Sequence, residues 1–154
     1  MVGPAACHHP PAGSETIART PTSQNVTASE ELLAAALSAL QEGISIEGPD
    51  LRIVYANAAY GRMFGDDVTG MACYEVYERW SGHKQECPVR EITGTGERRR
   101  VYCEKEEAGR RLTLEIMGTP VTDTSGRVIA GVEAVRDVTE LVEAREQVQR
   151  KSAE

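Results

Sequence analysis

The chain has 154 residues, of which 40% are hydrophobic and 27% are charged, and this composition of a single globular domain excludes a disordered or fibrous protein. A net charge of −7 argues against a general nucleic-acid binder, and no apolar run approaches the roughly 18 residues of a membrane span. Because the N-terminus lacks an apolar export signal, we expect a cytoplasmic protein without membrane insertion, with its cysteine thiols reduced.

Composition divides the chain into three parts. Residues 1–28 are rich in Pro, Gly, Ser and Thr and poor in bulky apolar side chains, which predicts a flexible N-terminal tail. Residues 29–138 carry the periodic apolar pattern and are expected to form the folded domain. Residues 139–154 are polar, rich in helix-forming residues and free of Gly and Pro, which predicts a C-terminal helix.

The first half of the domain predicts short elements separated by clear turn signals. A first helix is expected to begin at a cap at Thr27 or Ser29 and to end at Gly43. Two strands and three short helices follow. The strands are expected over 44–47 and 52–56, and the helices over 58–64, 71–80 and from Pro88 to Gly94 or Gly96.

The last third predicts three strands, over 99–106, 111–117 and 127–138. Ala108 and Gly109 form the turn between the first two, and Pro120 is expected to close the second. The last strand is apolar at nearly every position, as is typical of a central strand covered on both faces. The element order predicts an α+β domain: a five-stranded antiparallel sheet with short helices on one face and flanking N- and C-terminal helices.

A series of short motifs, in this order and spacing, resembles the PAS sensor domains. The motifs are Glu42-Gly43-Ile44, 52–59, Phe64-Gly65, Gly70-Met71, 94–97, Pro120-Val121, 123–131 and the closing stretch 136–140. The resemblance covers about residues 30–140. It implies a PAS-like fold and a sensory role rather than an enzymatic one.

The resemblance also implies how such a domain works. It would bind a small ligand or cofactor, or respond to redox state, and relay the signal through its C-terminal helix to a histidine kinase or similar output in bacterial two-component signalling. Homodimerisation through the flanking helices is implied as well. The net charge of −7 separately predicts that there is no nucleic-acid partner. The alternative is a ligand-free PAS module for dimerisation or protein interaction. The sequence offers no nucleophile–base pair, phosphate loop or buried carboxylate pair that would indicate catalysis.

A ligand pocket is implied between the helices and the inner face of the sheet. Its candidate lining residues are Met63, Phe64, Met71, Tyr74, Tyr77, Trp80 and Ile92 from the helical segments, and Leu114, Ile116 and Val132 from the strands. The simpler interpretation is that most of these residues form plain core. Trp80, beside a polar loop, is the candidate for a movable lid.

Signal relay is expected at the junction between the last strand and the C-terminal helix. Thr139 is expected to cap that helix, and Asp137 to pair with Arg136 or another basic group. A shift of this junction would rotate the helix or change its register. Val138, Leu141, Arg145 and Val148 form a thin seam through which the helix could pair with its symmetry mate.

The cysteines leave three alternatives open. Cys73, His83, Cys87 and Cys103 together offer soft or borderline ligands for a metal ion or an iron–sulfur cluster. Cys87, at a helix N-terminus, is suited to a thiol redox switch. In the plainest interpretation Cys73 and Cys103 are small core residues and Cys87 is an ordinary cap.

Flavin and haem are both disfavoured as cofactors, and the cofactor stays unknown. Ala72, Tyr74 and Tyr77 stand where the flavin-photoreceptor motif has Asn, Arg and Gln. The predicted helix after Pro88 contains no His that could bind a haem iron.

Overall fold

The computed structural model describes residues 23–84 and 87–154, and it centres on one antiparallel sheet with the strand order β2-β1-β5-β4-β3. The strands are β1 (Gly43–Glu47), β2 (Ile53–Ala56), β3 (Arg99–Glu107), β4 (Arg110–Thr122) and β5 (Val128–Asp137). The helices are α1 (Ser23–Ala39), α2 (Ala58–Phe64), α3 (Cys73–Ser81), α4 (Pro88–Thr95) and α5 (Thr139–Ser152). The predicted α+β architecture with a five-stranded sheet is confirmed.

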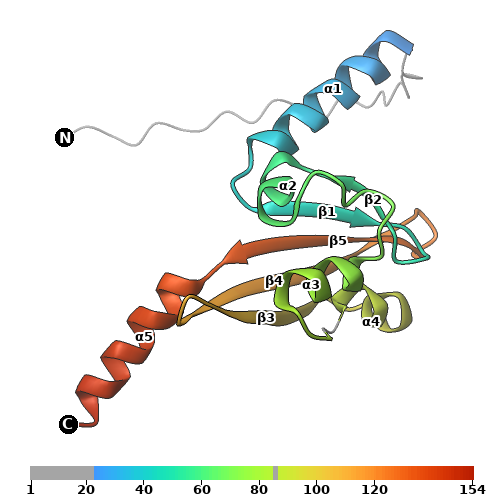
Figure 1. Ribbon diagram of the computed structural model, residues 1–154. Coiled ribbons are helices and arrows are strands. Elements are labelled where there is room, and N and C mark those ends of the chain that lie inside the picture. Colours follow the sequence, from blue (N-terminus) through green and yellow to red (C-terminus); the bar gives the residue numbers. More distant parts are fainter. Residues whose placement is uncertain (1–22, 85–86) are drawn as a thin grey trace, which may run out of the picture.

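Helices α2, α3 and α4 lie against the sheet, whereas α1 and α5 project away from it in opposite directions (Figure 1). Most of the predicted tail lies outside the described residues, and α1 begins at Ser23, ahead of the caps expected at Thr27 or Ser29. Within the described part of the chain, none of the helices is both long and apolar enough to cross a bilayer.

The central position expected for β5 from its apolar sequence is confirmed, but the expected cover on both faces is wrong, because the face turned away from the helices is only partly buried. Strand β5 is the central strand, paired with β1 on one side and β4 on the other. The expectation that Pro120 closes β4 is wrong, because β4 stays paired with β5 as far as Thr122. Beyond Gly118, which lies opposite Arg99 at the start of β3, β4 is an edge strand on one side, and a proline is tolerated there.

Helix α4 packs directly on the sheet because two strand positions lack a side chain. A Cβ atom built on Gly131 of β5 would lie 2.7 Å from Cγ1 of Val89, and one on Gly118 of β4 would lie 2.5 Å from Cδ1 of Ile92. Such separations are too short for carbon atoms in contact. The two glycines therefore set how closely α4 approaches β4 and β5.

We predict that Gly131→Ala destabilises the domain by about 1–3 kcal/mol, because the new methyl group overlaps the β-branched and therefore stiff Val89 side chain. Gly94→Ala in α4 is the control: a Cβ there has no neighbour within 4 Å, so this change should be neutral or stabilising. Urea unfolding of both variants measures the difference. Equal stabilities for the two would contradict the close packing.

Candidate functional site

The inner face of β1 and β5 carries two carboxylates within an otherwise apolar core. Ser45 and Glu47 share this face of β1, and Glu133 of β5 lies opposite Ser45. The side chains of Glu47 and Glu133 are both 0% exposed. Burial of two neighbouring acids is costly unless protons or hydrogen bonds compensate, so this cluster marks the candidate site.

Hydroxyl groups supply part of that compensation. Ser45 Oγ donates a hydrogen bond to Glu47 Oε1 over 2.5 Å, and the Tyr77 hydroxyl of α3 donates to Glu133 Oε2. The Tyr60 hydroxyl of α2 donates in turn to the Tyr77 oxygen over 3.4 Å. One oxygen of each carboxylate, Glu47 Oε2 and Glu133 Oε1, has no hydrogen-bond partner among the described residues.

Protonation of the carboxylate pair also reduces the cost of its burial. Burial, together with the neighbouring charge of Glu133, raises the pKa of Glu47 to about 9. Burial also raises the pKa of Glu133, against the lowering effect of its hydrogen bond from Tyr77. The pair therefore retains a proton at neutral pH and does not carry two full negative charges.

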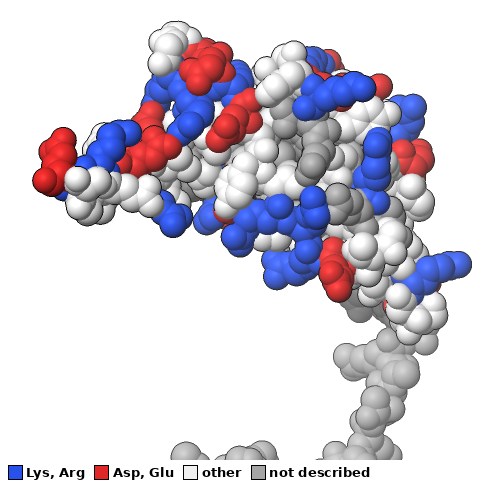
Figure 2. All heavy atoms as spheres, turned by 90° about the horizontal axis from the view of Figure 1, so that it is seen from below, with Lys and Arg blue, Asp and Glu red and all other residues white. Residues whose placement is uncertain are grey.

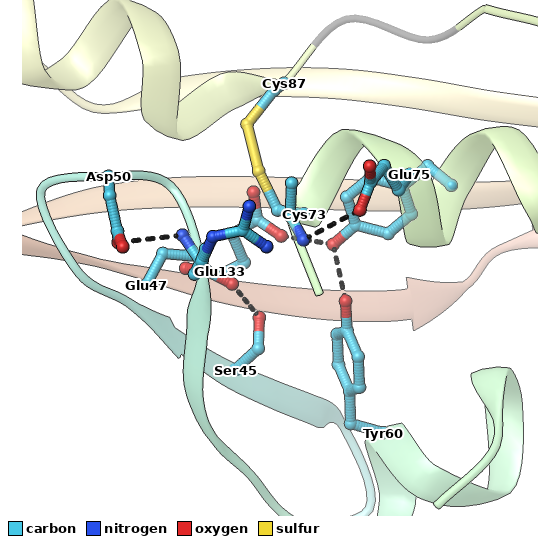
Figure 3. The surroundings of a disulfide bond; sticks show 11 residues. Ser45, Glu47, Asp50, Tyr60, Cys73, Glu75, Cys87 and Glu133 are labelled. Carbon is cyan, nitrogen blue, oxygen red and sulfur yellow. Dashed lines mark hydrogen bonds between the residues drawn. A yellow bond between two sulfur atoms is a disulfide. The ribbon is translucent and has the colours of Figure 1, made fainter. Parts of the chain in front are cut away.

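A disulfide between Cys73 and Cys87 lies next to this acidic pair (Figure 3). Cys73 is the first residue of α3 and Cys87 the N-cap of α4, with their Cα atoms 6.6 Å apart, so the bond ties the starts of two helices together. Both sulfur atoms and a carboxylate oxygen of Glu133 lie within 4.8 Å of one another. The helices supply the sulfurs and the strands supply the carboxylates.

The disulfide corrects the expectation of uniformly reduced thiols. Pairing requires Cα atoms within about 7 Å, and spacing along the sequence cannot reveal that separation. Cys87 is the N-cap of α4 as expected, but its side chain makes no capping hydrogen bond. Cys103 is a free, buried thiol, and burial raises its pKa to about 11.

The four-residue ligand set expected from the sequence is not assembled. In the described part of the chain, Cys73 and Cys87 group with Glu133, which the sequence analysis did not consider. His83 instead borders a surface hollow beside Lys105. Two neighbouring thiols do not supply the four thiolates that an iron–sulfur cluster usually requires.

The expectation that the chain has no buried carboxylate pair is also wrong. In β1 the apolar Ile44 and Ile46 alternate with the polar Ser45 and Glu47. Both sets of positions are largely covered, and the polar set lies beneath the helices. Gly43 lies on the same face of β1 as Ser45 and Glu47, and its small size is the sequence signal that a helix packs closely on this face. A Cβ atom added at Gly43 would lie 3.2 Å from the Tyr60 Cα atom.

Most of the predicted pocket residues belong to the packed core. Phe64, Tyr77, Ile92, Leu114 and Ile116 are buried in one cluster, and Met71, Tyr74, Trp80 and Met63 pack at its edge. Trp80, the candidate lid, has the Lys105 ammonium 4.5 Å from its ring centre. Met63 also lines a surface hollow of about 630 Å³ at the end of β5.

The prediction that Val132 lines the pocket is wrong. Alternate residues of a strand face opposite sides, and Gly131, Glu133 and Val135 occupy the inner, buried face. Val132 therefore faces away from the helices and cannot line a space between them and the sheet.

The junction between β5 and α5 is held by hydrogen bonds that partly differ from those expected. Asp137 Oδ1 accepts from the Thr139 amide over 2.9 Å, whereas Arg136 pairs with Glu115 over 2.7 Å. Thr139 is the first residue of α5 rather than its cap, and its Oγ1 accepts from the Thr113 amide over 3.0 Å. The Thr113 carbonyl accepts from the Val138 amide, so β4 holds both sides of the junction.

Ion pairs continue this attachment along α5. Arg110 donates two hydrogen bonds to the Glu143 carboxylate, at 2.7 and 2.9 Å, and Arg111 pairs with Glu146. The Arg110 guanidinium holds the pKa of Glu143 below its usual range. Blue and red side chains alternate on the projecting end of the molecule, at the left of Figure 2. The first turns of α5 are thus fixed to the β3–β4 hairpin.

Comparison with known proteins places these features in context. A family model described as PAS fold matches residues 37–143. No curated protein matches the chain. Among solved structures, an RNA-binding light-oxygen-voltage receptor is 22% identical with a TM-score of 0.66, and the match covers 95% of this chain but 42% of the receptor.

Two further structures share the fold. The PAS domain of Bordetella pertussis BvgS is 19% identical, with a TM-score of 0.52 and coverage of 82% of this chain and 99% of that one. VqmA from Vibrio cholerae, solved with ligand and DNA, is 20% identical, with a TM-score of 0.54 and coverage of 79% and 57%. The chain thus spans little more than half of VqmA, and identities this low show a common fold only.

We predict that the domain loses stability as the pH rises from 5 to 9. Glu47 holds its proton more tightly in the folded state, with a pKa of about 9 against an ordinary 4.5, so the stabilisation is complete below pH 4.5 and is lost as pH rises toward 9. The slope approaches about 1.4 kcal/mol per pH unit for each proton. Urea unfolding at a series of pH values measures it.

Glu47→Gln should flatten this dependence and exceed the wild type in stability increasingly toward pH 9, because an amide cannot ionise. Exposed Glu97→Gln is the control and should follow the wild-type curve. Parallel curves for the wild type and Glu47→Gln would show that the buried pair does not hold the proton.

We predict that Thr139→Val costs about 1–3 kcal/mol of stability, because the buried Thr113 amide loses its acceptor while the side-chain shape is kept. Exposed Thr124→Val is the matched control and should change stability by less than about 0.5 kcal/mol. Thermal unfolding compares the two. If Thr139→Val lowers the stability no more than the control does, the hydrogen bond between Thr113 and Thr139 does not stabilise the junction.

Proposed function

This chain belongs to the PAS family, and on that basis we propose that it is a sensory domain whose input is the redox state of Cys73 and Cys87. The observation that carries the proposal is the disulfide within 4.8 Å of Glu133, on the strand that leads into α5. Disulfides in the reducing cytoplasm are usually transient and redox-sensing. In the cytoplasmic location that we expect, formation of this bond reports oxidation.

The proposed relay follows contacts from the disulfide to α5. Tyr77 of α3 is hydrogen-bonded to Glu133, and Val89 of α4 packs on Gly131, so both tethered helices touch β5. Strand β5 continues from Glu133 through Val135 to its last residue, Asp137. The Asp137 side chain accepts a hydrogen bond from the amide of Thr139, the first residue of α5. Freeing the helix starts would shift β5 and with it the α5 junction.

The proposed output is a histidine kinase or a similar domain, reached through α5 in a homodimer. Large apolar side chains on both projecting helices support pairing with a second copy: Leu32 and Leu33 of α1 are 70% and 64% exposed, and Leu141 and Val148 of α5 are 66% and 65% exposed. In a homodimer, the α1 and α5 helices of the second copy would bury these side chains. We expect no nucleic-acid partner for this domain, given its net charge of −7.

We do not propose an enzyme, although the carboxylate pair was unforeseen. Both acids are 0% exposed, and two tyrosines and the disulfide lie over them, so a substrate has no route to them in this conformation. A ligand-free module for dimerisation is the second candidate, and the packing of most predicted pocket residues into the core favours it. It differs in requiring no response to oxidation.

We predict that reducing the disulfide of the full chain with a phosphine speeds backbone amide exchange in α3 and α4, and also at Thr113 and Thr139. An increase of about tenfold corresponds to about 1.4 kcal/mol in the free energy of opening. Hydrogen–deuterium exchange with peptide mass spectrometry measures it.

Cys73→Ser should resemble the reduced wild type under both conditions. Cys103→Ser is the matched control, because it removes the free buried thiol and leaves the pair intact. A change confined to α3 and α4, with none at the α5 junction, would overturn the proposed relay and leave the dimerisation module as the better account.

A further inference from the structure

The cysteine pair and one of the buried acids together have the composition of a metal site. Sγ of Cys73, Sγ of Cys87 and a carboxylate oxygen of Glu133 lie within 4.8 Å of one another, and all three residues are buried. Thiolates together with a carboxylate form a ligand set that suits Zn²⁺ and related thiophilic divalent cations. A single ion at their centre would contact all three after small rotations of the side chains.

A second observation points to the same place. Glu133 is 0% exposed, and its Oε1 atom has no hydrogen-bond partner in the described part of the chain, although a buried acceptor normally has one. Its Oε2 atom accepts from Tyr77, which fixes the carboxylate from the side of α3. Fixing one oxygen by a hydrogen bond while leaving the other free is the usual arrangement of a carboxylate that binds a metal.

Electrostatics favours a cation here. Glu47 and Glu133 lie side by side, and among the described residues neither has a basic side chain as a hydrogen-bond partner. A divalent cation would offset the charge of Glu133 and of two thiolates.

We propose that the reduced Cys73–Cys87 pair, together with Glu133, binds a divalent thiophilic cation of the zinc class. This inference rests on the proposed redox role, since the cation can bind only when the disulfide is open. Opening it takes two electrons and two protons from a dithiol reductant, which is oxidised to its own disulfide. Each thiol then releases its proton to solvent as its sulfur binds the cation, and water takes the fourth position.

Oxidation reverses the binding. A disulfide oxidant accepts two electrons from the two cysteine sulfurs and leaves as two thiolates, while the new S–S bond removes both sulfurs as ligands. The site then has Glu133 alone, and the cation departs. Metal release and disulfide formation would therefore be one event.

Cobalt(II) binding to the full-length chain tests the proposal. Cys7→Ser, His8→Ala and His9→Ala are introduced throughout, so that this N-terminal cluster cannot bind the probe. The protein is reduced, freed of reductant without air and titrated with Co²⁺. We expect a thiolate-to-cobalt charge-transfer band and tetrahedral d–d bands that saturate at one equivalent, and that Zn²⁺ then removes. The oxidised protein should show neither band.

Matched variants locate the ligands. Cys73→Ser and Cys87→Ser should lose the charge-transfer band of the dithiolate site, and Glu133→Gln should weaken binding by at least about tenfold. Cys103→Ser should bind as the parent does. Far-ultraviolet circular dichroism verifies that each variant is folded. In the parent, Zn²⁺ should slow alkylation of Cys73 and Cys87 but not of Cys103, and this readout needs no substitution at the site.

Two results would overturn the inference: a reduced parent that shows no charge-transfer band, or bands that survive in both Cys73→Ser and Cys87→Ser. Failure of the metal site is separable from failure of the redox role. If amide exchange at the α5 junction still responds to reduction in metal-free protein, the redox proposal stands without the cation. If cobalt binds but the junction does not respond, the cation site stands and the relay fails.

Discussion

A carboxylate removed from water loses its hydration, and Glu47 and Glu133 lose theirs side by side on the inner face of the sheet. The polar groups packed against the two carboxylates have to compensate for this lost hydration. Ser45, Tyr60 and Tyr77 point their hydroxyl groups inward, and a retained proton reduces the charge. Helices α2 and α3 are thereby bound to the central strands by polar contacts as well as by apolar ones. Such a network favours one arrangement of the helices on the sheet, because another arrangement would leave a buried acid without its hydrogen bonds.

The same arrangement ties the interior to the edge of the molecule. Strand β5 holds Glu133 at its middle and Asp137 at its end, and it lies between β1 and β4. In the proposed relay, a change at Glu133 would be carried along this paired central strand to Asp137. The hydrogen bonds of Thr113 and the ion pair of Arg110 then fix α5 to the same hairpin. Strand β5 and the β3–β4 hairpin thus connect the buried acids to α5.

The sequence predicted the fold well and the site poorly, for physical reasons. Local signals such as Pro88 at a helix start and the apolar run of β5 determine elements and their order. The disulfide, the carboxylate pair and the attachment of α5 depend on which distant residues meet. The sequence of β1 does not indicate that Glu47 is buried beneath the helices, since a mostly buried strand does not reveal which side the helices cover. Asp137 and Thr139 were located by motif, but Thr113, which is hydrogen-bonded to Val138 and Thr139, lies 26 residues from Thr139 and gives no local signal.

The bond between Cys73 and Cys87 spans a sequence separation of 14 residues. A crosslink closing a loop of this size adds roughly 3 kcal/mol to folding in the chain-entropy treatment, a sizeable share of the 5–15 kcal/mol typical of a domain. The reduced, metal-free protein thus has a smaller free energy of unfolding than the oxidised one. Substitutions anywhere in the core that are harmless under oxidising conditions can unfold the reduced domain. Tolerance to mutation in this chain is therefore set by its less crosslinked form.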